Sequence, residues 1–209
     1  ATGPISIDSP FYSAEVEKYP LDLAKAARLL DAAGVKPNAS GTRLALTVDY
    51  LPGVSDAKVI AEYLKPALAK VGIELIVRAS PDFPTWARRT STFNYDLSVD
   101  SAWNWGDPVI GVHRTWLSSN IREGVIWSNT QSYSNPKVDQ LLAQAGKEMD
   151  AAKRKALYAE FQSIVVDDCP VAFIYEPSFH VGYAAKVQGR PTSPWGLVSS
   201  LDGLGLKKG

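Results

Sequence analysis

The residues of this chain best suited to binding chemistry lie in one short run, from Trp103 to Trp116. The run opens with Trp-Asn-Trp-Gly-Asp-Pro at residues 103–108 and closes with His-Arg-Thr-Trp at residues 113–116. Indole rings stack on flat or apolar groups, an amide forms hydrogen bonds, and a carboxylate and a guanidinium pair with opposite charges. This mixture favours a surface that holds a small polar ligand over a buried core.

Five residues of this run are candidate ligand contacts. Trp103 and Trp105 would stack on a ligand or wall it off, unless the alternate tryptophans belong to the core. Asn104 would form a hydrogen bond with the ligand, and Arg114 would pair with an acidic group of it. Asp107 is the fifth candidate, although we favour a helix cap for it, because it precedes a proline at an expected helix start.

The sequence offers no catalytic constellation and no metal site. His113 and His180 are the two histidines, and neither has a carboxylate or cysteine at ligand spacing. Cys169 is the only cysteine, which excludes an internal disulfide. No nucleophile elbow, zinc-protease, P-loop or dinucleotide motif occurs. We therefore expect no enzyme activity and no cofactor, and no metal unless a domain outside this chain contributes ligands.

The charge pattern excludes further classes of partner. Lys and Arg number 22, as do Asp and Glu, so the net charge is zero, and no block of like charge occurs. This balance argues against a nucleic-acid partner and against binding to an anionic membrane surface. The Arg88-Arg89 pair is most simply a solvated helix end. No apolar run approaches the roughly 20 residues that span a bilayer.

The elements that would position the run alternate between strands and helices. Hydrophobic periodicity and capping residues predict helices over 22–33, 55–71 and 82–89, and strands over 44–48, 73–77 and 95–99. This rhythm predicts right-handed crossovers on a largely parallel sheet. The Trp103 run then follows the third strand, where parallel α/β sheets place their ligand crevices.

The rest of the chain is expected to be more helical and then irregular. We expect a helix from about Asp107, a loop over 117–134, helices from Asn135 and Asp150, and a short buried strand over 171–175. After Val187 the pattern dissolves into Gly, Pro and Ser. Five apolar residues remain there without an obvious partner and predict a tail that packs on a domain outside this chain: Leu197, Val198, Leu201, Leu204 and Leu206.

The order of several motifs resembles the C-terminal part of the extracellular solute-binding proteins of family 5. The motifs together cover about residues 3–185. In the first half of the chain they are Tyr-Pro-Leu-Asp at 19–22, Leu-Leu-Asp-Ala-Ala-Gly at 29–34, Leu-Ala-Lys-Val-Gly-Ile at 68–73 and Phe-Asn-Tyr-Asp-Leu at 93–97. In the second half they are the Asp-Pro step at 107–108, the stretch 133–142, and Asp150 with Ala-Lys-Arg at 152–154 and Tyr-Ala-Glu-Phe-Gln at 158–162.

This resemblance implies a periplasmic-binding-protein-like lobe of type II, with a largely parallel sheet flanked by helices. Residues 1–185 would form the C-terminal ligand-binding lobe, and residues 186–209 a return segment that packs on an N-terminal lobe. The start at Ala1, without Met or leader, then indicates a piece of a longer protein.

The implied function is that of the substrate-binding component of an ABC importer. Such a receptor captures a peptide-like, opine-like or oligosaccharide solute between two lobes and delivers it to permease subunits, in the periplasm or tethered outside a Gram-positive cell. Two alternatives stay open: the accessory substrate-binding domain of an enzyme, and a structural or interaction module.

The resemblance also bears on the cargo. Peptide receptors of this family carry an Asp four residues before the Pro of the acidic-Pro step, and it pairs with the α-ammonium of the peptide. This chain has Asn104 at that position. An amide cannot neutralise a buried ammonium, so we expect a neutral, acidic or sugar-like cargo, or a peptide held by other groups. Asp100 and Asp107 are the carboxylates that could substitute.

Overall fold

The structure is a computed structural model that describes residues 1–207 except 179, 194 and 196–198. Two residues of the expected tail, Leu197 and Val198, therefore lie outside the described residues. The chain divides into two compact units, each built from separate stretches. Unit 1 contains residues 1–16, 103–113 and 141–209, and unit 2 contains residues 17–102 and 114–140. The predicted division of the chain near residue 185 stays a prediction.

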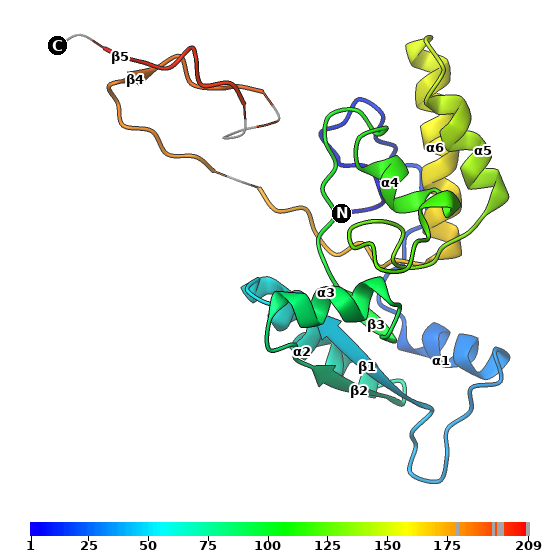
Figure 1. Cartoon of the computed structure of the whole chain (residues 1–209). Coiled ribbons are helices and arrows are strands. Elements are labelled where there is room, and N and C mark those ends of the chain that lie inside the picture. Colours follow the sequence, from blue (N-terminus) through cyan, green and yellow to red (C-terminus); the bar gives the residue numbers. More distant parts are fainter. Residues whose placement is uncertain (179, 194, 196–198, 208–209) are drawn as a thin grey trace. The chain divides into compact units, whose positions relative to one another are not determined.

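Unit 2 contains a three-stranded parallel sheet in the order β2-β1-β3 (Figure 1). The strands are β1 (Leu44–Tyr50), β2 (Ile73–Arg78) and β3 (Leu97–Val99). Asp49 of β1 lies opposite Arg78 on one side and Ser98 on the other. The predicted strand–helix–strand rhythm and the parallel sheet are confirmed.

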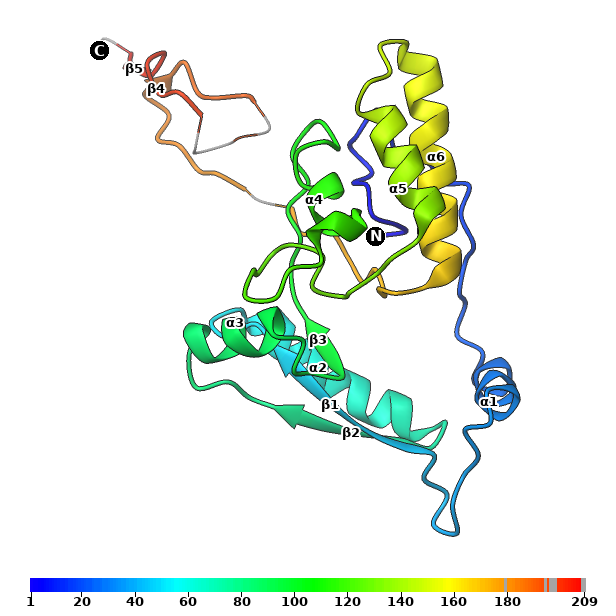
Figure 2. The ribbon, with the colours of Figure 1, turned by 45° about the vertical axis from the view of Figure 1, so that its right-hand side comes forward.

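Three α-helices of unit 2 stand where the sequence predicts them: α1 (Leu23–Ala32), α2 (Ser55–Ala69) and α3 (Phe83–Ser91). Asp22 and Asp82 cap α1 and α3 with carboxylate oxygens that accept backbone N–H groups. α1 ends before Gly34, whose φ of 79° is the left-handed conformation that glycine adopts at low cost. Helix α2 lies along one face of the sheet (Figure 2), where Ala61 packs with Val48 and Leu75.

Unit 1 is organised around α6 (Ala151–Asp168), which Asp150 caps as predicted. The last residues of α5 (Pro136–Ala145) also belong to this unit. Its buried side chains come from α5, α6 and the N-terminal segment, and include Ile5, Leu141, Leu142, Tyr158, Phe161 and Val165. Near the C-terminus, β4 (Val187–Gln188) pairs antiparallel with β5 (Gly205–Leu206), a short strand pair that the sequence did not indicate.

The helix expected from Asp107 begins later, as α4 (Val112–Trp116). Residues 107–111 form turns instead, because Gly111 has a φ of 111°, outside the helical range. A Cβ at Gly111 would overlap the carbonyl oxygen of Trp103. The loop over 117–134 is confirmed, apart from the 3₁₀ turn η1 (Ser118–Asn120).

The buried strand expected over residues 171–175 is wrong. These residues form no strand, and Ile174 and Tyr175 are 52% and 46% exposed. A buried strand needs neighbours on both sides, and no strand of the described chain pairs with this segment. The third strand is also shorter than expected, since Asp96 bonds to Thr47 just before β3 begins.

Candidate functional site

Trp103 and Trp105 belong to a stack of three indoles in unit 1. Their ring centroids are 5.6 Å apart with planes 18° from parallel, and Trp195 stacks on Trp105 at 4.7 Å and 17°. Trp103 is 54% exposed and Trp195 is 41% exposed, so neither is a core residue. Two indole faces near the surface provide a flat apolar platform at low entropic cost. The sequence indicated the first two rings but not Trp195.

Asn104 is held by the N-terminal segment of the same unit. Its side-chain Nδ2 donates a hydrogen bond of 2.8 Å to the carbonyl oxygen of Pro4. Because one N–H of the amide is used by Pro4, Asn104 can offer another partner its acceptor Oδ1 and the second hydrogen of Nδ2. The residue is exposed, as a ligand contact requires.

Asp107 is engaged by Arg154 of α6. Its Oδ2 and Oδ1 accept from Nη1 and Nη2 of Arg154, both at 2.8 Å. This hydrogen bonding lowers the pKa of Asp107 and raises that of Arg154. Asp107 also accepts the N–H of Val109, so it stabilises a turn rather than the helix start that we expected.

His113 is buried beside this ion pair, and its Nε2 lies 2.9 Å from the hydroxyl oxygen of Tyr158. Burial lowers the pKa of His113 to about 4. The imidazole is therefore neutral at pH 7 and has a packing role. No group of three or more His, Cys, Asp or Glu side chains in the described part of the chain could hold a metal ion.

Arg114, the fifth candidate, belongs to unit 2. Its Nη2 donates to the carbonyl oxygen of Ile126 at 3.2 Å, and the residue is exposed. The other four candidates lie in unit 1, where three of them, Trp103 to Trp105, are adjacent in the chain. That all five contact one ligand stays a prediction.

A charged cluster lies at the carboxyl ends of β1 and β2. Asp49 is fully buried and accepts hydrogen bonds from both Arg78 and Arg89. Arg89 also donates to the hydroxyl of Ser80 at 3.2 Å. The expectation of a solvated Arg88-Arg89 helix end is therefore wrong for Arg89, which ties α3 to the sheet. The sequence contained little indication of this cluster, because an Asp in a strand is usually exposed and Asp49 would not be expected to be buried.

A second group at this edge contains Asp100, which the sequence offered as a substitute carboxylate, together with Phe83 and Trp127, which we did not name as ligand contacts. Asp100 directly follows β3, and the aromatic rings of Phe83 and Trp127 lie 5.6 Å apart. Burial raises the pKa of Asp100 to about 6, although the residue as a whole is exposed, while the N–H of Ser101 and the Trp127 side chain lower it by hydrogen bonding. Two sequence features could have indicated this group: the carboxylate of Asp100 directly after a parallel strand, and Trp127 in a long loop.

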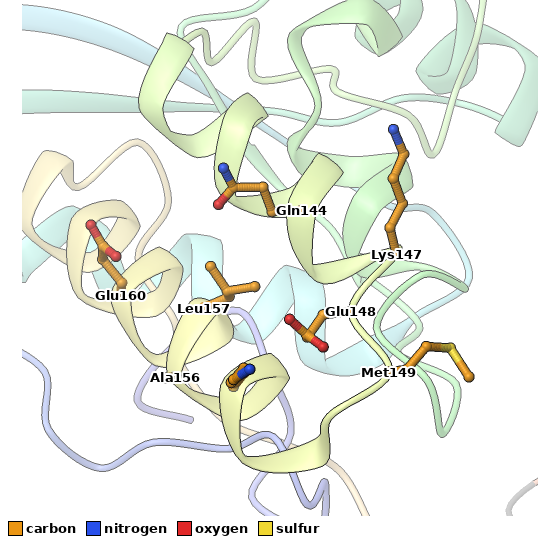
Figure 3. A pocket seen from close by; sticks show the side chains of 8 residues that line it. Gln144, Lys147, Glu148, Met149, Ala156, Leu157 and Glu160 are labelled. Carbon is orange, nitrogen blue, oxygen red and sulfur yellow. The ribbon is translucent and has the colours of Figure 1, made fainter.

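A groove also lies between α5 and α6 in unit 1 (Figure 3). Its lining combines two lysines, two glutamates and apolar groups: Gln144, Lys147, Glu148, Met149, Lys153, Ala156, Leu157 and Glu160. Met149 is 94% exposed at the turn between the helices. The groove is open and its charges are balanced, so it selects no ligand chemistry.

Among the described residues, no helix has the length and apolar character that crossing a bilayer requires.

Comparison with known proteins places this geometry in context. The sequence model of the family described as "Bacterial extracellular solute-binding proteins, family 5 Middle" matches residues 1–124. Among curated proteins, Protein XP55 of Streptomyces lividans is 30% identical over 97% of this chain and 36% of its own length. The glutathione-binding protein GsiB of Pectobacterium atrosepticum is 29% identical over 97% of this chain and 39% of its own length. The chain thus spans a little over a third of these relatives.

Solved structures agree on the fold. The oligopeptide-binding protein AppA of Bacillus subtilis, in complex with a nonapeptide, matches all of this chain and 42% of its own, with a TM-score of 0.78 and 20% identity. A putative peptide-binding protein AppA from Clostridium difficile covers 81% of this chain and 33% of its own, with a TM-score of 0.70 and 25% identity. The expected α/β fold of the periplasmic-binding-protein type is confirmed.

Proposed function

This chain belongs to the bacterial extracellular solute-binding proteins of family 5, and from that premise we propose that it is a ligand-binding portion of the receptor of an ABC importer. The receptor captures a small solute and passes it to permease subunits, and the chain carries out no chemistry on it. The family is one of extracellular binding proteins. The proposal places this member in the periplasm or tethered to the outer face of the cell membrane.

One observation of the molecule supports this role above the others. Trp103, stacked on the half-buried Trp105, exposes its indole at the surface of unit 1, and the exposed amide of Asn104 is next to it in the chain. A platform of indoles next to an oriented amide can hold a solute by stacking and a hydrogen bond. Such groups fix the orientation of a ligand, whereas most of the affinity comes from enclosing its surface.

Enclosure requires more wall than this chain supplies. Curated relatives extend to nearly three times the matched length, and receptors of two lobes close on their ligand by a hinge motion. We propose that a further lobe supplies the other wall and packs against residues 186–209. The 209-residue chain alone should then bind solutes weakly, and micromolar or tighter binding in a calorimetric titration of this piece would overturn the two-lobe proposal.

We propose a neutral, acidic or sugar-like cargo, or a peptide held by other groups, because of Asn104. Its amide supplies a hydrogen bond and no charge, so it cannot neutralise a ligand ammonium at that position. Native mass spectrometry of the full-length protein, purified from its source, tests the receptor function directly. A co-purifying small solute is the expected result. A full-length sequence with a catalytic nucleophile or metal motif, and a protein that converts the solute, would instead establish the accessory domain of an enzyme.

A further inference from the structure

We propose that the loop between β4 and β5 forms a binding site for a neutral sugar ring, carried by Trp195, Arg190 and Asp202. The inference rests on the proposed function and deepens it, since it assigns a carbohydrate unit to the captured solute. The site belongs to unit 1, as does the Trp103–Trp105 run. None of its three main residues is among the five candidate contacts that the sequence indicated.

The two ends of this loop are held together. Strands β4 and β5 pair antiparallel and lie side by side (Figure 1). Directly beyond them, Gly189 has a φ of 69°, and a Cβ on this residue would overlap the carbonyl oxygen of Gly203. Only glycine permits a backbone approach this close in the left-handed conformation. Surface loops whose ends meet in this way frequently carry function.

The described residues of the loop line an open hollow of about 670 Å³, a volume in the range of small-ligand sites. Hydroxyl groups dominate the polar part of this lining. They come from Thr192, Ser193, Ser199 and Ser200. The hydroxyl oxygens of Ser193 and Ser199 lie 2.5 Å apart and bond to each other. A hydroxyl both donates and accepts, so this lining matches a ligand that itself carries several hydroxyl groups.

The hollow also contains one positive and one negative side chain, Arg190 and Asp202. Both residues are exposed, and the guanidinium of Arg190 lies 5.8 Å from the ring centre of Tyr183. In the described part of the chain, neither Arg190 nor Asp202 has an ion-pair partner. A guanidinium only donates and a carboxylate only accepts, so together they can bind the oxygens and the hydrogens of neighbouring sugar hydroxyls. Because the two charges balance, the hollow favours a neutral solute over an ion.

The apolar wall of the hollow is Trp195. Its ring stacks on Trp105 with centroids 4.7 Å apart and planes 17° from parallel, and the residue is 41% exposed. The stacking covers one face of the indole and fixes its orientation, so a ligand can reach the ring from the other face. A sugar ring has a face of C–H groups that packs on such a surface while its hydroxyls point to the sides. This arrangement agrees with the uncharged amide of Asn104.

The test titrates the full-length protein, with ¹⁵N-labelled indoles, with methyl β-D-glucopyranoside, a neutral sugar ring. The Trp195 resonance, identified by its loss in Trp195→Phe, should shift and saturate. Glycerol carries hydroxyls but no ring face, and should bind at least about tenfold more weakly. Asp202→Asn should weaken binding of the glucoside about fivefold, because an ionised acceptor forms stronger hydrogen bonds than an amide oxygen.

Asp8→Asn is the matched control, because it removes one exposed carboxylate of the same unit outside the loop. It should leave glucoside binding unchanged, and the other indole resonances verify that each variant is folded. No shift of Trp195, equal binding of glucoside and glycerol, or equal binding by Asp202→Asn and the wild type would overturn the sugar site. A full-length protein that still captures a solute after such a result retains the proposed function, whereas one that captures none loses both.

Discussion

Arg154 donates two parallel hydrogen bonds to Asp107, from Nη1 to Oδ2 and from Nη2 to Oδ1, each of 2.8 Å. The Nε of Arg154 donates to the carbonyl oxygen of Ala145, and its guanidinium lies 4.8 Å from the ring centre of Phe11. One side chain of α6 thereby joins the turn at 107–111, the end of α5 and the N-terminal segment. The acidic-Pro step is therefore an anchor within unit 1.

This anchor predicts an order of effects. Arg154→Ala should lower the free energy of unfolding more than Asp107→Asn, because it removes the ion pair, the bond to Ala145 and the stacking on Phe11. Asp107 is 42% exposed in its side chain, so Asp107→Asn should cost only about 1 kcal/mol. Urea unfolding of both variants measures this. Equal losses for the two variants would show that the ion pair dominates the anchor, and a larger loss for Asp107→Asn would contradict the predicted order.

The burial of His113 predicts a stability that depends on pH. Its pKa is about 4 in the folded chain against 6.5 as the ordinary value, so between these two pH values the unfolded state binds more protons. Stability from this residue is complete above pH 6.5 and falls as the pH drops towards 4, by about 3 kcal/mol in all. Urea unfolding at several pH values measures the fall.

Two variants isolate this contribution. His113→Gln should flatten the slope of unfolding free energy between pH 6.5 and 4, whatever its effect at pH 7. His180→Gln, which changes an exposed histidine, should keep the wild-type slope. If the slope of His113→Gln equals that of the wild type, other groups cause the acid sensitivity.

The Asp49 cluster predicts that the adjacent residues Arg88 and Arg89 contribute differently to the stability of the fold. Arg89→Met should destabilise the chain by more than 1 kcal/mol, because it removes one of the two partners of a fully buried carboxylate. Arg88→Met is the matched control and should have little effect, since Arg88 is exposed. Asp49→Asn should cost about 3 kcal/mol or more, because both guanidiniums lose their counter-charge. Equal effects of the two arginine variants in urea unfolding would contradict this cluster.

The sequence predicted the sheet because its local signals agree with the fold. Leu44, Leu46 and Val48 alternate as a strand requires, and Asp22 and Asp82 are caps that need only nearby backbone. Where a local pattern depends on distant partners, the prediction failed. Residues 171–175 are apolar enough for a buried strand, but the described chain offers them no neighbouring strand.

The sequence singled out only some residues of the candidate site, for a similar reason. The sequence named Trp103 and Trp105 as candidate contacts because they lie in one short run, but the stacking of Trp195 joins residues ninety apart in the chain and left no local pattern. The delayed start of α4 had a signal in Gly111, whose close approach to Trp103 excludes a helix there. The pairing of Phe83 with Trp127 depends on how the 117–134 loop folds, which composition does not reveal.

The hydrogen bond of Asn104 predicts a change in stability that can be measured without any ligand. Asn104→Asp replaces the N–H donor that faces the Pro4 carbonyl by a carboxylate oxygen, so two acceptors would face each other. We expect a loss of about 1–3 kcal/mol in the free energy of unfolding. Asn94→Asp, at an exposed amide, should have a much smaller effect. Equal effects of the two changes would mean that the bond to Pro4 does not hold Asn104.

Ligand capture should change the fluorescence of the indole stack in the full-length protein. Closure of two lobes removes water from a platform in the cleft, and the emission of an indole depends on the water around it. Trp103 is 54% exposed, whereas Trp105 stacks on both Trp103 and Trp195, so Trp103→Phe should remove most of the ligand-induced emission change and Trp105→Phe a smaller part. Trp116→Phe is the control, because Trp116 is buried against Tyr133 and should not report on closure. If the change survives both stack variants, the ligand binds away from this platform.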